Sequence, residues 1–271
     1  MTLRIAVSGS TGRMGRTLIE VIGGDPDLAL AVALEHTGHP MLGQSVPGQV
    51  VSSEKEILIR SDHRSALNGA DILIDFTRPD GTLAHLESCV ANGVSAVIGT
   101  TGFSEAQIQE IRRHAEKIPV VLAPNMAVGV NAAFRLAGIA ATILGAGFDV
   151  EIIEAHHRDK VDAPSGTALK LGQVIADARG QSLEDVAVYG RRGITGVRER
   201  STIGFHAIRG GDIVGEHTVL FSGDGERVEI TVRSSSRNTY AQGAIRAAKF
   251  LASRSRGLFD MADVLGLRVP G

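Results

Sequence analysis

The first half of the chain alternates short apolar runs with longer amphipathic stretches. The apolar runs, such as LRIAVSG and DILIDF, show no alternation of polar and apolar positions. Runs of this kind are typical of strands in a parallel sheet that helices cover on both faces. Strands are expected over 3–9, 28–35, 71–76, 95–102 and 119–125, and helices over 15–24, 81–93 and 104–117. This order of elements predicts an α/β domain built on a doubly wound parallel sheet.

The second half shows a different pattern. Helices are expected over 130–144, 167–178 and 240–253, and strands over 148–155, 201–208, 212–221 and 226–233. In the last strand Val228, Ile230 and Val232 alternate with polar residues, which predicts an antiparallel sheet with one polar face. The segments RGG and SGDG are read as hairpin-type turns between the last three strands.

Two domains are therefore expected, 1–128 and 129–238, with the terminal segment 239–271 returning to the first. The second domain is expected to be α+β with a mixed or antiparallel open sheet.

Composition excludes several classes of partner. The 271 residues are 43% hydrophobic and 21% charged, with a formal net charge of −2, so no overall basic surface for nucleic acid is expected. We also expect no membrane partner, because no window of about 18 uncharged apolar residues stands out. The single cysteine, Cys89, is expected to be a buried small side chain, and it favours a reducing cytoplasm as the location.

A glycine-rich loop follows the first expected strand. Gly9, Gly12 and Gly15 are spaced G-x-x-G-x-x-G, a variant of the dinucleotide-binding fingerprint, and a helix follows. Glu35 ends the second strand 20 residues after Gly15, where a carboxylate would bind a ribose diol. The first domain is therefore expected to be a Rossmann-like dinucleotide-binding domain. His36 leaves the choice between NADH and NADPH open.

Two further turns are expected at the same edge of the sheet, where ligands of such sheets bind. They are 99–102 (GTTG) and 123–126 (APNM), and they should flank the nicotinamide, although APNM can also be a simple connection. The expected cofactor-binding residues are Gly9, Ser10, Thr11, Gly12, Arg13, Met14, Glu35, His36, Gly99, Thr100, Thr101, Ala123, Pro124, Asn125 and Met126.

The segment EAHHRDKVDAPSGTAL gathers candidate chemistry after one strand. His156 and Lys160 can each supply the proton that a hydride acceptor needs. Cations beside a helix that begins near Ser165 form an anion site, which predicts a small di-acid as substrate. Ser165 and Thr167 can also simply cap that helix. No metal is expected, because no cysteine or carboxylate completes a set with His156 and His157 at metal-ligand spacing.

These motifs together resemble dihydrodipicolinate reductases. The resemblance covers nearly the whole chain and rests on GSTGRMG, DFTRPDGT, GTTGF, NMAVGVN, EIIEAHHRDKVDAPSGTAL, GFHAIRGGDIVGEHTV, SSSRNTYAQGA and GLFDMADVL. It implies reduction of a small cyclic dicarboxylate by NADH or NADPH in lysine and diaminopimelate biosynthesis. It also implies a homotetramer joined through the sheets of the second, substrate-binding domain.

The resemblance also implies roles for individual residues. His156 and Lys160 would be the proton donors, whereas His157, Gly166 and Thr167 would bind the substrate carboxylates. Two positions depart from the usual pattern: many members carry arginine where this chain has His36, and Met126 replaces an aromatic residue. The alternatives are a homoserine- or aspartate-type dehydrogenase and a sensor without catalytic activity. A sensor would be expected to lose His156 or Lys160, and this chain keeps both.

Overall fold

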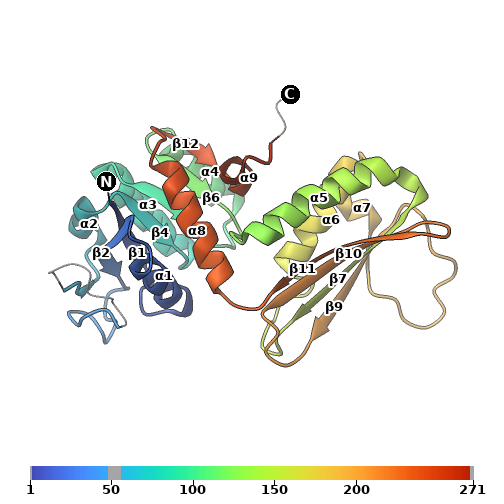
Figure 1. Ribbon diagram of the computed structural model, residues 1–271, viewed down its shortest axis with the longest axis horizontal. Helices are drawn as coiled ribbons and strands as arrows, with labels where there is room; N and C mark the ends of the chain where they lie inside the picture. Colours follow the sequence, from blue (N-terminus) through green and yellow to red (C-terminus); the bar gives the residue numbers. More distant parts are fainter. Residues whose placement is uncertain (1, 48–55, 269–271) are drawn as a thin grey trace. The chain divides into compact units, whose positions relative to one another are not determined.

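The computed structural model describes residues 2–47 and 56–268, and these residues form two compact units. The first unit comprises Met1–Val128 and Arg237–Gly271, and the second comprises Gly129–Ser236. The chain thus enters the second unit once and returns to the first through its last helices (Figure 1).

The first unit contains a seven-stranded sheet in the order β12-β6-β5-β4-β1-β2-β3, and each of its strand pairs is parallel. Its strands are β1 (Leu3–Ser8), β2 (Leu28–Leu34), β3 (Ile59–Arg60), β4 (Ile72–Asp75), β5 (Ser95–Ile98), β6 (Pro119–Leu122) and β12 (Gly257–Phe259). Its helices are α1 (Arg13–Gly23), α2 (His63–Ala66), η1 (Leu67–Gly69), α3 (Pro79–Asn92), α4 (Glu105–Ala115), α8 (Asn238–Leu251) and α9 (Met261–Leu265).

Both faces of this sheet are buried, as the unbroken apolar runs predicted. Ile5 and Val7 of β1 pack in one cluster with α1 and α8, whereas Ala6 packs in a second cluster with α3 and α4. Cys89 of α3 lies in the second cluster and is fully buried, and burial raises the pKa of its thiol. The expected doubly wound parallel sheet is therefore confirmed.

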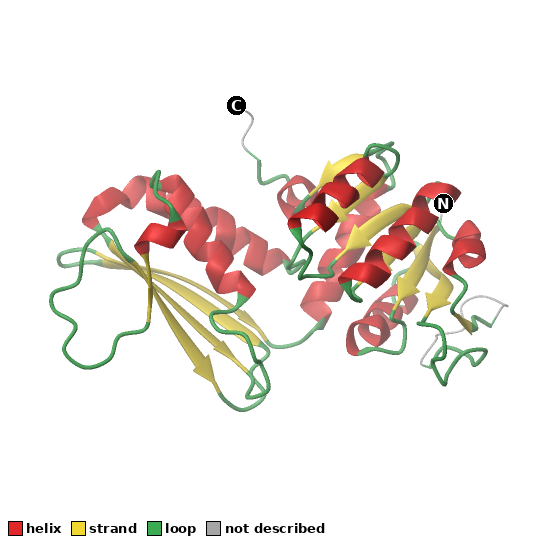
Figure 2. Cartoon of the chain, turned by 180° about the vertical axis from the view of Figure 1, so that it is seen from behind, coloured by secondary structure: helices red, strands yellow, loops and turns green. Residues whose placement is uncertain are grey.

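The second unit contains a five-stranded mixed sheet in the order β11-β10-β7-β9-β8. Its strands are β7 (Asp149–His156), β8 (Ala187–Tyr189), β9 (Ile203–Arg209), β10 (Gly215–Ser222) and β11 (Arg227–Ser234). Its helices are α5 (Val128–Leu144), η2 (Gly145–Gly147), α6 (Gly166–Ala178) and α7 (Leu183–Val186). Helices α5 and α6 lie on one face of this sheet (Figure 2), where Ala137, Leu171 and Ile175 pack against Val150 and Phe221.

The expected α+β unit with a mixed sheet is confirmed, but only one of the two expected hairpins forms. SGDG does form a hairpin, because β10 pairs with β11 in antiparallel register. RGG does not, because β7 lies between β9 and β10 and pairs in parallel with β9. Gly210 N–H donates to the carbonyl of His156, and Arg158 N–H donates to the carbonyl of Gly211, so the segment crosses the end of β7. Alternation within a strand does not encode which strand lies beside it.

Among the described residues, one helical segment, Val128–Gly147, has the length and composition of a membrane span. It contains Arg135, and its Val130, Ala133, Ala137 and Ala141 are buried in the protein. These buried positions recur every three or four residues, so one face of α5 is buried, whereas Leu136, Ile139 and Ile143 are exposed.

Candidate active site

Four turns meet at the carboxyl edge of the sheet in the first unit. β1, β4, β5 and β6 are adjacent and parallel, so their carboxyl ends lie side by side. The glycine loop follows β1, and residues 76–78, 99–102 and 123–126 follow the other three strands. The strand order reverses beside β1, and this is where dinucleotides bind to such sheets.

The glycine loop is a tight turn that packs closely against the start of helix α1. Gly9 has φ +65°, which favours glycine, and its carbonyl accepts from Gly12 N–H at 3.0 Å. A Cβ on Gly15 would lie 2.1 Å from the Gly9 oxygen, so helix α1 and the loop are packed too closely for any side chain there. Gly12 is the N-cap of α1, and no side chain among the described residues caps this helix. Its first turn therefore suits a phosphate as capping group.

Glu35, the residue that follows β2, accepts hydrogen bonds from this loop. Thr11 donates to Glu35 Oε1 from its backbone N–H at 2.9 Å and from its hydroxyl at 2.7 Å. Both bonds end on one oxygen of the half-buried carboxylate. Glu35 therefore orders the loop, a structural role that the sequence reading did not give it.

His36 and His39 lie beside Glu35. Each of the three residues offers one atom that could bind a metal ion, and these atoms lie within 4.8 Å of one another. For each histidine, a backbone contact determines which ring nitrogen carries the hydrogen when the ring is neutral. His36 Nδ1 must donate to the carbonyl of Thr37, whereas His39 Nδ1 must accept from Met41 N–H. The neutral His39 therefore carries its proton on Nε2, the nitrogen near Thr11 Oγ1. The Nδ1 atoms of both histidines are therefore engaged by the backbone.

Several predicted cofactor residues face inward. Ser10 is buried, donates its N–H to Leu34 O, and its hydroxyl has no hydrogen-bond partner among the described residues. Thr100, Ala123 and Met126 are also buried, and Met126 belongs to the core beside α8. The substitution at Met126 therefore alters the core of the first unit.

The other predicted cofactor residues lie at or near the surface. Arg13, His36, Thr101 and Pro124 are exposed, whereas Met14, Gly99 and Asn125 are partly buried. Asn125 Oδ1 accepts from Ala127 N–H and so shapes the turn after β6.

The second unit builds a charged cluster where β7 ends. His156 Nδ1 donates to Glu154 Oε2 at 2.6 Å, and Arg209 of β9 forms two hydrogen bonds with the same carboxylate. Glu154 is 1% exposed. Burial alone would raise the pKa of Glu154, but Arg209 and His156 outweigh it and hold that pKa below the usual range. Glu154 is therefore an ionised acceptor that fixes the proton of His156 on Nδ1 and leaves Nε2 for a ligand.

A second buried histidine adjoins this pair. His217 of β10 lies opposite Glu154 in the sheet, and its ring meets that of His156 edge to face at 5.1 Å between centroids. Its Nε2 lies 2.9 Å from Ser165 Oγ. Burial, and then the positive charge of His156, lower the pKa of His217 to about 4. His217 is therefore neutral at physiological pH and adds no charge to the site.

Ser165 connects the cluster to helix α6. Its N–H donates to Glu154 Oε1 at 3.1 Å, and its hydroxyl accepts from Ala168 N–H as the N-cap of α6. The expected capping role of Ser165 is thus confirmed. Gly166 and Thr167 form the first turn of α6, where helix N–H groups favour an anion.

The loop between β7 and α6 turns instead of staying extended. Lys160 N–H donates to the carbonyl of His157, and Arg158 and Asp159 are exposed, as expected of solvated loop charges. Lys160 Nζ contacts both oxygens of Asp162, at 2.7 and 2.8 Å. Lys160 and His157 are each partly buried.

Sequence reasoning missed Glu154, Arg209 and His217. Glu154 stands two residues before His156, so both side chains point to the same face of β7, and this spacing was a usable signal. Arg209 and His217 reach the site only through the pairing of β7 with β9 and β10, which sequence spacing does not reveal.

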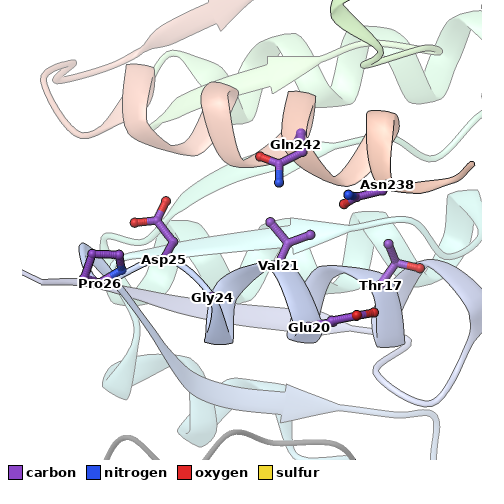
Figure 3. A pocket seen from close by; sticks show the side chains of 8 residues that line it. All are labelled: Thr17, Glu20, Val21, Gly24, Asp25, Pro26, Asn238 and Gln242. Carbon is purple, nitrogen blue, oxygen red and sulfur yellow. The ribbon is translucent and has the colours of Figure 1, made fainter.

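Figure 3 shows a pocket between α1 and α8, away from the turns just described. Its lining consists of Thr17, Glu20, Val21, Gly24, Asp25, Pro26, Asn238 and Gln242. None of these residues is among the predicted cofactor or catalytic residues.

A glycine loop at the carboxyl edge of a parallel sheet, together with a separate unit that carries an ordered buried histidine, is typical of two-unit dinucleotide-dependent oxidoreductases. Comparisons with known proteins identify which one. Residues 3–126 match the family model for the dihydrodipicolinate reductase N-terminus, and residues 129–265 match the one for its C-terminus. The chain belongs to the dihydrodipicolinate reductase family.

Individual relatives agree with this assignment. The chain is 60% identical over 266 residues to a 4-hydroxy-tetrahydrodipicolinate reductase of Nitrosomonas europaea, covering 98% of this chain and 99% of the relative. It is 58% identical over 268 residues to one of Aromatoleum aromaticum, covering 99% and 97%. The solved structure of a dipicolinate-bound dihydrodipicolinate reductase from Paenisporosarcina sp. TG-14 superposes with a TM-score of 0.75 at 27% identity, covering 97% of this chain and 99% of that one.

Proposed function

We propose that this chain reduces 4-hydroxy-tetrahydrodipicolinate to tetrahydrodipicolinate in lysine and diaminopimelate biosynthesis, with NADH or NADPH as reductant. The overall change adds one hydride and one proton to the substrate and releases one water. Family membership supports the reaction, and the buried Glu154–His156 pair carries the proposal because it supplies an oriented proton donor.

The first unit is proposed to hold the cofactor. The glycine loop and the first turn of α1 would bind the pyrophosphate, Glu35 the adenosine ribose, and the turns at 99–102 and 123–126 the nicotinamide end. The reduced nicotinamide supplies the hydride when it is bound. The close packing at Gly15 and the glycine N-cap of α1 fit a dinucleotide there.

The second unit is proposed to bind the substrate and protonate it. Because Glu154 holds Nδ1, His156 gives its proton from Nε2, and Arg209 keeps Glu154 ionised throughout. Lys160 is the second proposed donor, provided that its contact with Asp162 opens when substrate arrives.

The substrate carboxylates are proposed to lie against His157 and the first turn of α6. Gly166 and Thr167 present backbone N–H groups at a helix N-terminus, which favours an anion. The solved relative that holds dipicolinate, an aromatic di-acid, supports a cyclic dicarboxylate as ligand.

A homotetramer in the cytoplasm completes the proposal. Helices α5 and α6 pack on one face of the five-stranded sheet, and the other face carries Glu151, His206 and Ile208. Ile208 is 51% exposed on that face, which suits a sheet that meets another copy of itself.

A coupled assay tests the reaction. Pyruvate and aspartate semialdehyde are condensed in place, the protein is added, and absorbance of NADH or NADPH is followed. Rapid oxidation is expected from the parent, and His156→Gln should lower kcat by about 10²–10⁴ while the circular dichroism spectrum is unchanged. Equal turnover by folded His156→Gln would remove the proposed donor, and absence of oxidation by a parent that binds NADH would favour the sensor.

A further inference from the structure

A second buried polar network lies in the first unit, under the turns of the cofactor edge. Its centre is Asp75, the last residue of β4, which is 1% exposed. Asp75 Oδ1 accepts from Thr77 N–H at 2.8 Å and from the Thr77 hydroxyl at 2.6 Å. Asp75 Oδ2 lies 2.8 Å from His85 Nδ1 on α3.

The network continues into the next turn through Thr100. The Thr100 hydroxyl accepts from Thr77 N–H at 3.0 Å and from Thr82 Oγ1 at 2.8 Å, and it donates to Asp75 Oδ1 at 3.3 Å. Asp75 thus joins the turn after β4 to the turn after β5, and Thr82 joins both to the first turn of α3.

Close packing joins the same segment to the glycine loop. A Cβ on Gly9 would lie 3.2 Å from Thr77 Cγ2, and a Cβ on Gly99 would lie 2.1 Å from the Phe76 ring. The Oγ atom of Ser8, the last residue of β1, lies 3.3 Å from His85 Nδ1. Residues 75–77 therefore lie between the glycine loop, proposed to hold the pyrophosphate, and the GTTG turn, proposed to hold the nicotinamide end.

Asp75 remains an ionised acceptor in this setting. Burial alone would raise the pKa of Asp75, but the contacts with His85 and Thr77 outweigh it and lower that pKa. An ionised acceptor makes charge-assisted bonds, which are stronger than neutral ones. A buried carboxylate at the end of a sheet strand is costly unless its partners are all in place.

We propose that Asp75, His85, Thr82 and the Thr100 hydroxyl form a positioning network that fixes the glycine loop and the GTTG turn for the cofactor. The proposal rests on the proposed function, which places the dinucleotide at this edge. It assigns Thr100 a role through its buried hydroxyl and not through contact with the cofactor. Without the network, the glycine loop and the GTTG turn would become ordered only when the cofactor binds. The free energy of ordering them would then weaken cofactor binding.

Isosteric variants test the network. Asp75→Asn keeps the shape but removes the charge, and Thr82→Val keeps the shape but removes the hydroxyl. The dissociation constant for NADH, from cofactor fluorescence, should rise about tenfold in Asp75→Asn and about fivefold in Thr82→Val. Thr82→Ser, which keeps the hydroxyl, should return to within about threefold of the parent. The control Thr142→Val removes an exposed hydroxyl bonded to Gly138 O in the second unit and should change nothing.

A second readout separates positioning from general damage. The dissociation constant for dipicolinate should stay within about twofold of the parent in each variant, because the proposed di-acid site lies in the second unit. NADH binding by folded Asp75→Asn and Thr82→Val as tight as that of the parent would overturn the network. Equal weakening in Thr82→Ser and Thr82→Val, or weakening of dipicolinate to the same extent as NADH, would overturn it as well. A parent that neither binds NADH nor oxidises it would instead overturn the proposed function.

Discussion

The contact between Glu154 and His156 determines which ring nitrogen of His156 can give a proton. A carboxylate only accepts, so Nδ1 keeps its hydrogen, and in the proposed reaction Nε2 is the nitrogen that changes protonation. Arg209 offsets the negative charge, so the pair is ordered without leaving a lone buried charge. The geometry therefore assigns Glu154 the task of orienting the donor.

The pH profile follows from this contact. Burial lowers the pKa of His156, and Glu154 raises it in part, so it lies below the ordinary value of about 6.5. Since the donor must be protonated, kcat/KM for the substrate should fall about tenfold per pH unit above that pKa. Glu154→Gln removes the group that raises the pKa of His156, so the decrease in kcat/KM should begin at lower pH. A decrease that begins at the same or a higher pH would contradict the role proposed for Glu154.

His217 should make the protein less stable in mild acid. Its folded pKa of about 4 lies below the unfolded value of about 6.5, so the unfolded state binds more protons between these values. Stability should therefore rise with pH in this window and fall as pH decreases. From pH 7 to pH 5 the loss from His217 is roughly 2 kcal/mol.

Urea unfolding of the parent and of His217→Gln at the two pH values measures this contribution. The variant should show a smaller difference in unfolding free energy between pH 7 and pH 5, whereas His114→Gln in α4 serves as control. An equal difference in the parent and in His217→Gln would rule out a neutral, buried His217.

At the scale of the residue, sequence reasoning proposed His156 and Lys160 as donors and did not find the groups that contact His156. His156 and Lys160 could be proposed from the sequence because histidine and lysine are residue types that can donate a proton. Arg209 and His217 carry no such signal, since they become neighbours of Glu154 only through strand register. His85 likewise contacts buried Asp75, a partner ten residues away that sequence spacing does not indicate.

At the scale of the element, local signals were sufficient where the contacts are local. Ser104 and Gln107 form the capping box of α4, and the helix expected over 104–117 begins there. Strand β12 was not predicted, because three residues carry too little periodicity, and it is recognised only by pairing with β6. The misread RGG turn has the same cause, since strand order depends on contacts distant in sequence.

Helix α1 depends on the glycine at its first turn. In Gly15→Ala the new Cβ would meet the Gly9 oxygen at 2.1 Å and Ser10 Cα at 2.7 Å, and neither backbone atom can move aside cheaply. We expect a loss of about 2 kcal/mol in unfolding free energy and at least about tenfold weaker NADH binding. Gly24→Ala, at the other end of α1, meets nothing nearer than 3.7 Å and should leave both quantities near those of the parent. Equal effects of the two substitutions, in chemical unfolding and fluorescence titration, would show that close packing at the loop does not matter.

At the scale of the whole molecule, the expectation of two fold types along one chain was correct. The change from unbroken apolar runs to alternating ones marks the change from a sheet buried on both faces to one covered by helices on one face. The oligomeric state cannot be read from the pattern of apolar and polar residues in the same way. The face with Glu151, His206 and Ile208 mixes charge and apolar surface.

Sedimentation velocity tests the proposed assembly. We expect four copies of the 28.4 kDa chain in the parent and a smaller species in Ile208→Lys, because a lysine would bring charge into the contact between sheets. A parent that sediments as a single chain would exclude the tetramer.

The central claim is that this protein moves a hydride from a reduced nicotinamide into a cyclic di-acid. The most direct measurement is the mass of the product formed from substrate generated in place with NADH that carries deuterium at the transferable position. Our account predicts tetrahydrodipicolinate that contains one deuterium, and a much slower reaction with His156→Gln. A product without deuterium, or oxidation of the cofactor with no reduced di-acid formed, would contradict it.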